Sequence, residues 1–343
     1  MAHSLAKRLI HEPSFHVSTC QEEFVSPKCR YEEIRIKSCG TLYPDSPILQ
    51  LGDGPMTKAF YISAGFLFTS ISICCFDTKA YGWWVEGHSR IAEAASKILP
   101  HELPAFFRSA GKDLGHLAGD PDRWKNKDLP HLRSTESPEH FLDLEYLDDS
   151  PLPIDRYAML DFLREKKRKA TIVGMLPFAI IESHDRLACA FQDYRATPDD
   201  PIVRAKCLIQ AGILAHYTGD CSMPLHTTKD YDGKPDGNGG FKQRGIHARL
   251  DAFPEKHGIT AEELARGLTP NEFNALRDRV MDEIRHGHQF VPKTYELDSS
   301  GAFEKPTTES RDFVLARCRR GVRFTAELWI SAWRKSASLP KPY

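Results

Sequence analysis

The chain has 343 residues, 41% of them hydrophobic, and a formal net charge of −1. This length supports one large domain or two small ones with a proper hydrophobic core. The balanced charge excludes a global basic field, and with it tight non-specific binding to duplex nucleic acid, but leaves room for a local basic groove. Fifteen histidines are a high count and prompt a search for metal ligands.

The first 82 residues differ from the rest of the chain. Residues 59–75 form an uncharged apolar run of 17, and Ala80 and Gly82 provide the small residues that precede a signal-peptidase cleavage site. We predict a secretory signal peptide over 56–82 that is cleaved before Trp83. Because the run is barely long enough to cross a bilayer, a transmembrane anchor is the alternative.

Residues 1–55 precede this signal and show no clear periodicity. An export signal normally starts a chain, so the simplest explanation is that translation begins at Met56 and that 1–55 is a non-native or disordered extension; a genuine extension is the alternative. The mature protein would then be 83–343, secreted or periplasmic. An oxidising compartment would permit two disulfides among its four cysteines, with all three pairings open.

Helical periodicity dominates residues 83–343. Apolar spacing predicts helices over 87–98, 156–192 with a break at Pro177, 201–219, 271–288 and 309–335. Clusters of Pro, Gly and Asp predict loops over 120–139, 144–155, 193–200 and 228–245, and strand signals are few. No repeat is visible. The sequence therefore predicts a single compact all-α domain of many helices, with long loops on one side.

Two histidine–aspartate pairs suggest a metal site. His216 and Asp220 lie four residues apart near the end of a predicted helix, and His226 follows a tight CSMP connection. The same spacing recurs at His247 and Asp251. An i, i+4 spacing places both side chains on one helix face, and neutral imidazole with carboxylate suits zinc. Each pair alone is weak evidence, because surface helices often carry such pairs without a metal.

These pairs belong to a longer series that begins with the WWVEGH, GDPDRW and HFLD segments. The series resembles the zinc-dependent phospholipase C and single-strand nuclease superfamily, over nearly all of 83–343 and in the family's order. The resemblance implies an exported all-α enzyme with a cleft around three zinc ions and a mature chain that begins with tryptophan. It implies nine ligand positions, which are Trp83, His88, Asp120, His140, His216, Asp220, His226, His247 and Asp251.

The resemblance also implies how the ligands divide among the ions. One zinc would take Asp120, His140, His216 and Asp220; a second would take the amine and carbonyl oxygen of Trp83, with His88 and the bridging Asp220; the third would take His226, His247 and Asp251. An α-amine has a pKa of about 7.7–8.0, so a metal displaces its proton easily at neutral pH. Removal of 1–82 would therefore complete the site.

Clustered zinc ions favour hydrolysis of a phosphoric ester by a deprotonated bridging water. The metal ligands Asp120 and Asp220 would support this reaction, and Arg123 would neutralise charge on the phosphate. Phe141 could stack on a base and Asp143 could orient a ligand or its water. Arg123 as a solvated loop residue and Phe141 as a core residue are the alternatives.

Arg123 and the aspartate at position 251 favour the nuclease branch of the superfamily. Our first hypothesis is an endonuclease that cuts single-stranded RNA or DNA to 5′-phosphate products. The second is a phospholipase C that cleaves phospholipid head groups, and the third is a secreted helical protein with structural zinc only. The basic segment 164–169 (REKKRK) either modifies the cleft or is a solvated helix face. No stable protein partner is predicted.

Overall fold

A computed structural model describes residues 83–148 and 150–340. The chain divides into two units, Met1–Ile71 and Ser72–Tyr343, and every described residue belongs to the second. The predicted extension over 1–55 and signal peptide over 56–82 lie outside the described residues. Among the helices that are described, none is long and apolar enough to span a membrane.

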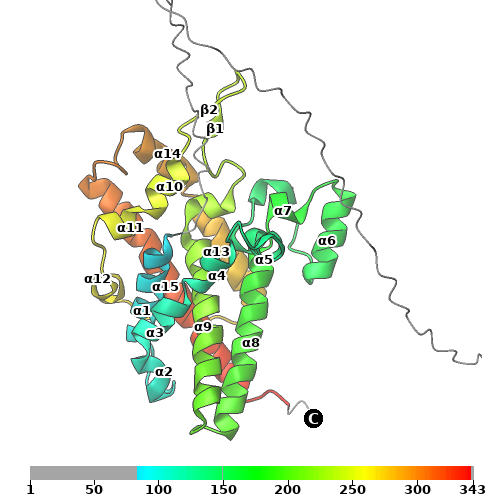
Figure 1. Cartoon of the computed structure of the whole chain (residues 1–343), viewed down its shortest axis with the longest axis vertical. Coiled ribbons are helices and arrows are strands. Elements are labelled where there is room, and N and C mark those ends of the chain that lie inside the picture. Colours follow the sequence, from blue (N-terminus) through cyan, green and yellow to red (C-terminus); the bar gives the residue numbers. More distant parts are fainter. Residues whose placement is uncertain (1–82, 149, 341–343) are drawn as a thin grey trace, which may run out of the picture. The chain divides into compact units, whose positions relative to one another are not determined.

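The described residues form an almost entirely helical domain, which confirms the predicted all-α class (Figure 1). The α-helices are α1 (Val85–Lys97), α2 (Ala105–Ser109), α3 (Gly111–Leu117), α4 (Asp120–Trp124), α5 (Pro130–Glu136), α6 (Arg156–Glu165), α7 (Ala170–Val173), α8 (Leu176–Ala196), α9 (Pro201–Ser222), α10 (Ile246–Asp251), α11 (Phe253–Lys256), α12 (Ala261–Ala265), α13 (Leu276–His288), α14 (Val291–Ser299) and α15 (Thr308–Ser336). Three short 3-10 helices are η1 (Ser137–His140), η2 (Leu144–Leu147) and η3 (Pro224–Thr227). Strands β1 (Lys234–Pro235) and β2 (Phe241–Lys242) pair antiparallel.

Helix α9 lies at the centre of the domain and contacts α1, α3, α8 and α15. It begins at Pro201, directly after Asp200, whose carboxylate caps the helix by accepting a hydrogen bond from the Ile202 amide at 2.8 Å. From Leu214 to Ser222 every residue of α9 is buried. A helix that is buried on all sides lies inside the core, so its last two turns place polar side chains in the interior.

The segment between Lys169 and Pro177 shows why the predicted helix over 156–192 is divided. Pro177 is the second residue of α8, where a proline fits because its missing amide has no helical partner. Gly174, just before α8, has φ +90°, and a Cβ there would lie 2.0 Å from the Phe141 carbonyl oxygen. Only glycine is accommodated at this position, so the chain turns between α7 and α8.

Two expectations from the sequence were wrong. The predicted loop over 120–139 contains α4, α5 and η1, because Pro121 and Pro130 begin helices rather than interrupt them. The expected disulfides are absent among the described residues, where all four cysteines are free thiols. Three of them are buried side chains of α9 and α15 (Cys207, Cys221 and Cys318) and act as small apolar core residues.

Candidate metal centre

Three groups of buried histidine and aspartate side chains lie in the described part of the chain. Within each group, the potential ligand atoms are all within 4.8 Å of one another. The groups are His88, His216 and Asp220; Asp122, His140 and His216; and His226, His247 and Asp251. They bring together side chains from α1, α4, η1, α9, η3 and α10. Seven of the nine predicted ligand positions belong to these groups, and the two exceptions are Asp120 and Trp83.

Asp220 occupies the middle of this arrangement. One of its oxygens, Oδ1, lies 3.3 Å from His88 Nε2 and 3.2 Å from His226 Nδ1. The other, Oδ2, lies 3.0 Å from His140 Nδ1 and 3.2 Å from His216 Nε2. A carboxylate with four imidazoles around it has the position that a bridging ligand needs.

The close approach of α1 to α9 depends on Gly219. A Cβ at this position would lie 2.8 Å from His88 Nδ1, so the absence of a side chain leaves room for the imidazole. The His88 ring stacks on the His216 ring with the centroids 3.8 Å apart. Gly219 therefore allows histidines from two helices to face the same carboxylate, Asp220.

Several of these buried polar atoms form no hydrogen bond. They include both ring nitrogens of His88 and both oxygens of Asp251. Other potential ligand atoms are nevertheless close to them. His88 Nε2 lies 3.3 Å from Asp220 Oδ1, and Asp251 Oδ2 lies 3.1 Å from His247 Nε2. Burial of unpaired polar atoms is unfavourable by roughly 1–3 kcal/mol each. Donor atoms that converge without hydrogen-bonding one another fit a metal-binding site.

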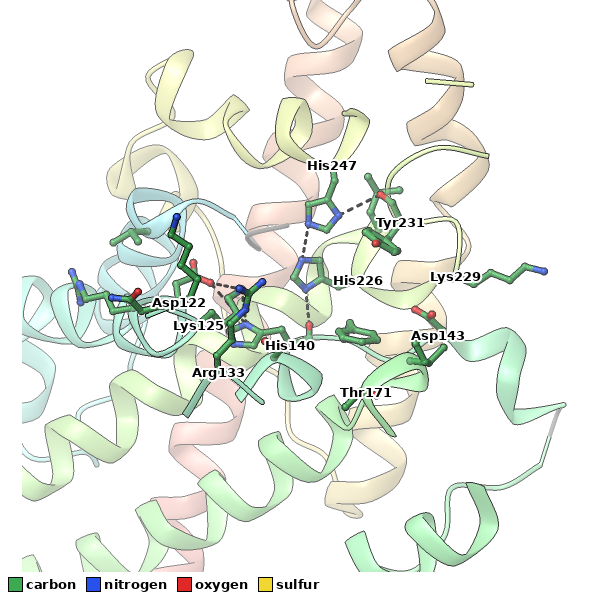
Figure 2. A pocket seen from close by; sticks show the side chains of 18 of the residues that line it. Asp122, Lys125, Arg133, His140, Asp143, Thr171, His226, Lys229, Tyr231 and His247 are labelled. Atoms are coloured by element: carbon green, nitrogen blue, oxygen red, sulfur yellow. Dashed lines mark hydrogen bonds and ion pairs between the residues drawn. The ribbon is translucent and has the colours of Figure 1, made fainter. Parts of the chain in front are cut away.

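Hydrogen bonds to backbone carbonyls orient two of the histidines. His216 Nδ1 lies 2.7 Å from the Ala118 oxygen, and His226 Nδ1 lies 2.6 Å from the His140 oxygen. A carbonyl only accepts, so each Nδ1 carries the proton and each Nε2 keeps its lone pair. His226 Nε2 and His247 Nε2 are 3.2 Å apart, and Figure 2 shows the His226 ring between His247 and the His140 carbonyl.

The protonation states also suit metal binding. Burial lowers the pKa of His88 to about 4 and that of His226 to about 3, so both rings are neutral at pH 7, the form that binds a cation. Burial would raise the pKa of Asp220, but the surrounding histidines outweigh it and hold that pKa well below the usual range. Burial raises the pKa of Asp251 to about 7, and a bound cation would lower it again.

The structure does not bring Asp120 into the cluster. Its carboxylate accepts a hydrogen bond from Arg123 at 2.6 Å and its side chain is 30% exposed. Asp122 is buried instead, with Oδ1 3.9 Å from His216 Nε2 and 4.0 Å from His140 Nδ1. Residues two apart on a helix point about 200° apart, so α4 directs only one of these carboxylates inward. We therefore put Asp122 in place of Asp120 in the proposed ligand set.

Trp83 is fully buried beside the cluster. Its indole Nε1 donates to Ser222 Oγ at 3.3 Å, and the next amide, that of Trp84, donates to the Asp251 carbonyl oxygen at 3.4 Å. Trp83 thus lies where the ligand-bearing helices α1, α9 and α10 meet. Metal binding by its amine and carbonyl oxygen stays a prediction.

A cavity of about 930 Å³ opens onto this cluster (Figure 2). Asp122, His140, His226 and His247 line it. The remaining predicted substrate residues, Arg123, Phe141 and Asp143, line it too. Burial, then Glu145 and Asp230, raises the pKa of Asp143 to about 8, so this carboxyl is mostly protonated at neutral pH.

Sequence reasoning missed Glu136. It lies 3.3 Å from His140 Nε2, and its Oε1 accepts a hydrogen bond from the Tyr217 hydroxyl at 2.6 Å. The Glu136 carboxylate thereby faces His140 Nε2, while Nδ1 of the same ring faces Asp220 and His216. The i, i+4 spacing of Glu136 and His140 was the available signal, but it falls in a segment that the sequence predicted to be a loop.

We expect Glu136→Gln to weaken zinc binding by about 10–100-fold, the usual loss when the partner of a metal-bound histidine is changed. Tyr217 and His140 both face Oε1 of Glu136, and glutamine would keep an oxygen there but remove the negative charge that favours a proton on His140 Nε2. Titration against a chromophoric zinc chelator measures this affinity. Glu165→Gln, at an exposed glutamate of α6, is the control; equal affinities for the two variants would contradict the orienting role.

Comparisons with known proteins give no family assignment. No family model and no curated protein matches the chain. Among solved structures, the alpha-toxin of Clostridium perfringens isolated from avian strain SWCP aligns at 15% identity and TM-score 0.42, over 76% of this chain and 66% of that chain. The alpha toxin of Clostridium absonum aligns at 12% identity and TM-score 0.40, over 78% and 67%. The chain spans about two thirds of both, and such values assign no activity.

Proposed function

We propose that this protein is a zinc-dependent hydrolase of phosphoric esters. The convergence of three buried His/Asp groups, two of which contribute side chains to the wall of one cavity, carries this proposal. Three ions would be held by Asp122, His140, His216 and Asp220; by Trp83, His88 and Asp220; and by His226, His247 and Asp251. Bound zinc would polarise phosphoryl oxygens and lower the pKa of water.

Basic side chains at the cavity supply the charge that a phosphate needs. Arg123, Lys125, Lys127 and Arg133 line it, and α4, α5 and the segment between them carry all four. The Asp120 carboxylate and the His116 carbonyl oxygen hold the Arg123 guanidinium, which is 43% exposed. A guanidinium that is already oriented loses little entropy when it binds a phosphate oxygen.

We propose phospholipid head groups as the substrate class. Exposed apolar or aromatic side chains also line the cavity, namely Val85, Ile172 and Tyr231. Apolar side chains at the edge of a basic cavity suit a substrate whose phosphate enters while its acyl chains stay outside. Export to the cell exterior or periplasm is part of this proposal.

A single-strand nuclease is the second candidate. The presence of both Arg123 and Phe141 at the cavity favours it, because the half-buried Phe141 ring could stack on a base next to the metal ligands.

One zinc-loaded preparation tests both candidates. We expect release of phosphocholine from short-chain phosphatidylcholine, lost with EDTA and restored by zinc. Release of acid-soluble nucleotides from denatured DNA, without release of phosphocholine, would show that the substrate is single-stranded nucleic acid and not lipid. If neither product forms while zinc is bound, the metal is structural and the proposed hydrolase is wrong.

A further inference from the structure

One flank of the domain combines exposed apolar residues with a basic segment. Ile154 is 74% exposed, Tyr157 77%, Leu160 41% and Ile172 52%. Residues 164–169, which join α6 to α7, are all exposed and carry five cations against one anion. We name these two sets together the α6–α7 surface (Figure 1).

The exposed apolar residues of α6, Tyr157 and Leu160, lie three positions apart on the helix, and Ile154 directly precedes the N-cap Asp155. Met159 and Leu163 are the buried side chains of α6. The helix therefore turns one apolar face inward and still exposes aromatic and aliphatic side chains, which is unusual for a helix that only faces water.

The cations of this surface exceed the carboxylates that could neutralise them. Arg164 pairs with Asp161, and Lys166 pairs with Asp148 at 3.1 Å. Within 83–148 and 150–340, Lys167 and Lys169 have no ion-pair partner. Their charges are therefore available to an external anion.

This surface is continuous with the cavity. The Arg168 guanidinium lies 4.6 Å from the centre of the Tyr146 ring, and Tyr146, Thr171 and Ile172 all line the cavity. Figure 2 shows Thr171 at this cavity. Arg156, the first residue of α6, makes two hydrogen bonds to Glu139, at 2.6 and 2.8 Å, next to His140. These contacts fix α6 and α7 relative to the metal ligands.

We propose that the α6–α7 surface docks on an anionic phospholipid bilayer and presents the cavity mouth to the lipid head groups. This inference rests on the proposed lipid substrate and deepens it. Lysines and arginines next to an anionic membrane are attracted to it, and exposed aromatic and aliphatic side chains enter the head-group region. A nucleic acid would use the cations but leave Ile154 and Leu160 in water.

Sedimentation with vesicles tests this docking. The zinc-loaded protein should bind vesicles of equal parts phosphatidylglycerol and phosphatidylcholine more tightly than vesicles of phosphatidylcholine alone. Lys167→Glu with Lys169→Glu should weaken binding to the anionic vesicles by about tenfold or more. Ile154→Ser with Tyr157→Ser should weaken binding to both. The matched controls are Lys112→Glu on α3 and Ile202→Ser on α9, which change equally exposed side chains elsewhere.

Hydrolysis assays separate docking from catalysis. The four α6–α7 substitutions should leave hydrolysis of monomeric short-chain phosphatidylcholine at the parent rate and lower that of vesicle lipid. If the double variants bind vesicles more weakly than the parent, but the parent itself hydrolyses no lipid, the docking inference is supported and the proposed function fails. The inference is overturned if both double variants bind vesicles as tightly as the parent. It is also overturned if the variants lose binding to single-stranded DNA and keep their binding to vesicles.

Discussion

Asp220→Asn should reduce bound zinc to at most one ion per chain and lower phosphoric-ester hydrolysis by on the order of 10³-fold. The carboxylate lies within 3.3 Å of nitrogens from His88, His140, His216 and His226, so its loss removes the common ligand of two proposed ions. The group formed by His226, His247 and Asp251 keeps its own donors and should retain its ion. Elemental analysis of the purified variant and a single hydrolysis assay measure both effects.

The neighbouring aspartates of α4 provide the matched comparison. Asp122→Asn should remove one zinc ion, because its carboxylate is buried beside His140 and His216. Asp120→Asn should keep the zinc content of the parent, since its partly exposed carboxylate belongs to none of the three His/Asp groups. A loss of zinc in Asp120→Asn but not in Asp122→Asn would restore the ligand assignment made from the sequence.

Retention of Gly82 should remove one zinc ion and lower hydrolysis by about 10²-fold or more. A peptide nitrogen cannot replace the α-amine of Trp83 as a ligand, whereas a free amine gives up its proton readily to a metal. The burial of the Trp83 indole against Ser222 would fix this terminus beside His88 and Asp220.

Two preparations test this dependence on cleavage. One begins at Trp83, the other keeps a single preceding glycine, and mass spectrometry verifies the first residue of each. Elemental analysis then compares their zinc contents. Full zinc content and full activity with Gly82 attached would show that the terminus is not a ligand.

The sequence predicted the long helices and the histidine positions because both follow local rules. Helical spacing located α1, α8, α9 and α15, and the i, i+4 pairs on α9 and α10 identified four of the clustered side chains. What local spacing could not decide was which of two adjacent carboxylates points inward. GDPD offers Asp120 and Asp122, and the choice depends on α4, which the proline-rich composition of the segment concealed.

Contacts between segments that lie far apart in the sequence could not be predicted from local patterns either. Glu136 takes its role from Tyr217 and His140, which only the packing of η1 on α9 brings together. The cysteines present the reverse case. Four of them in a chain that is predicted to be exported favour disulfides, yet their thiols are free in the structure and three fill the core between helices. In both cases tertiary packing, and not spacing along the chain, decides the outcome.

X-ray diffraction at the zinc absorption edge tests the central claim most directly. We predict three anomalous peaks in crystals of the protein that begins at Trp83, one within each His/Asp group and with Asp220 shared by two of them. Peaks elsewhere on the surface, or none beside His216 and Asp220 in the presence of saturating zinc, would contradict a catalytic metal centre in this fold.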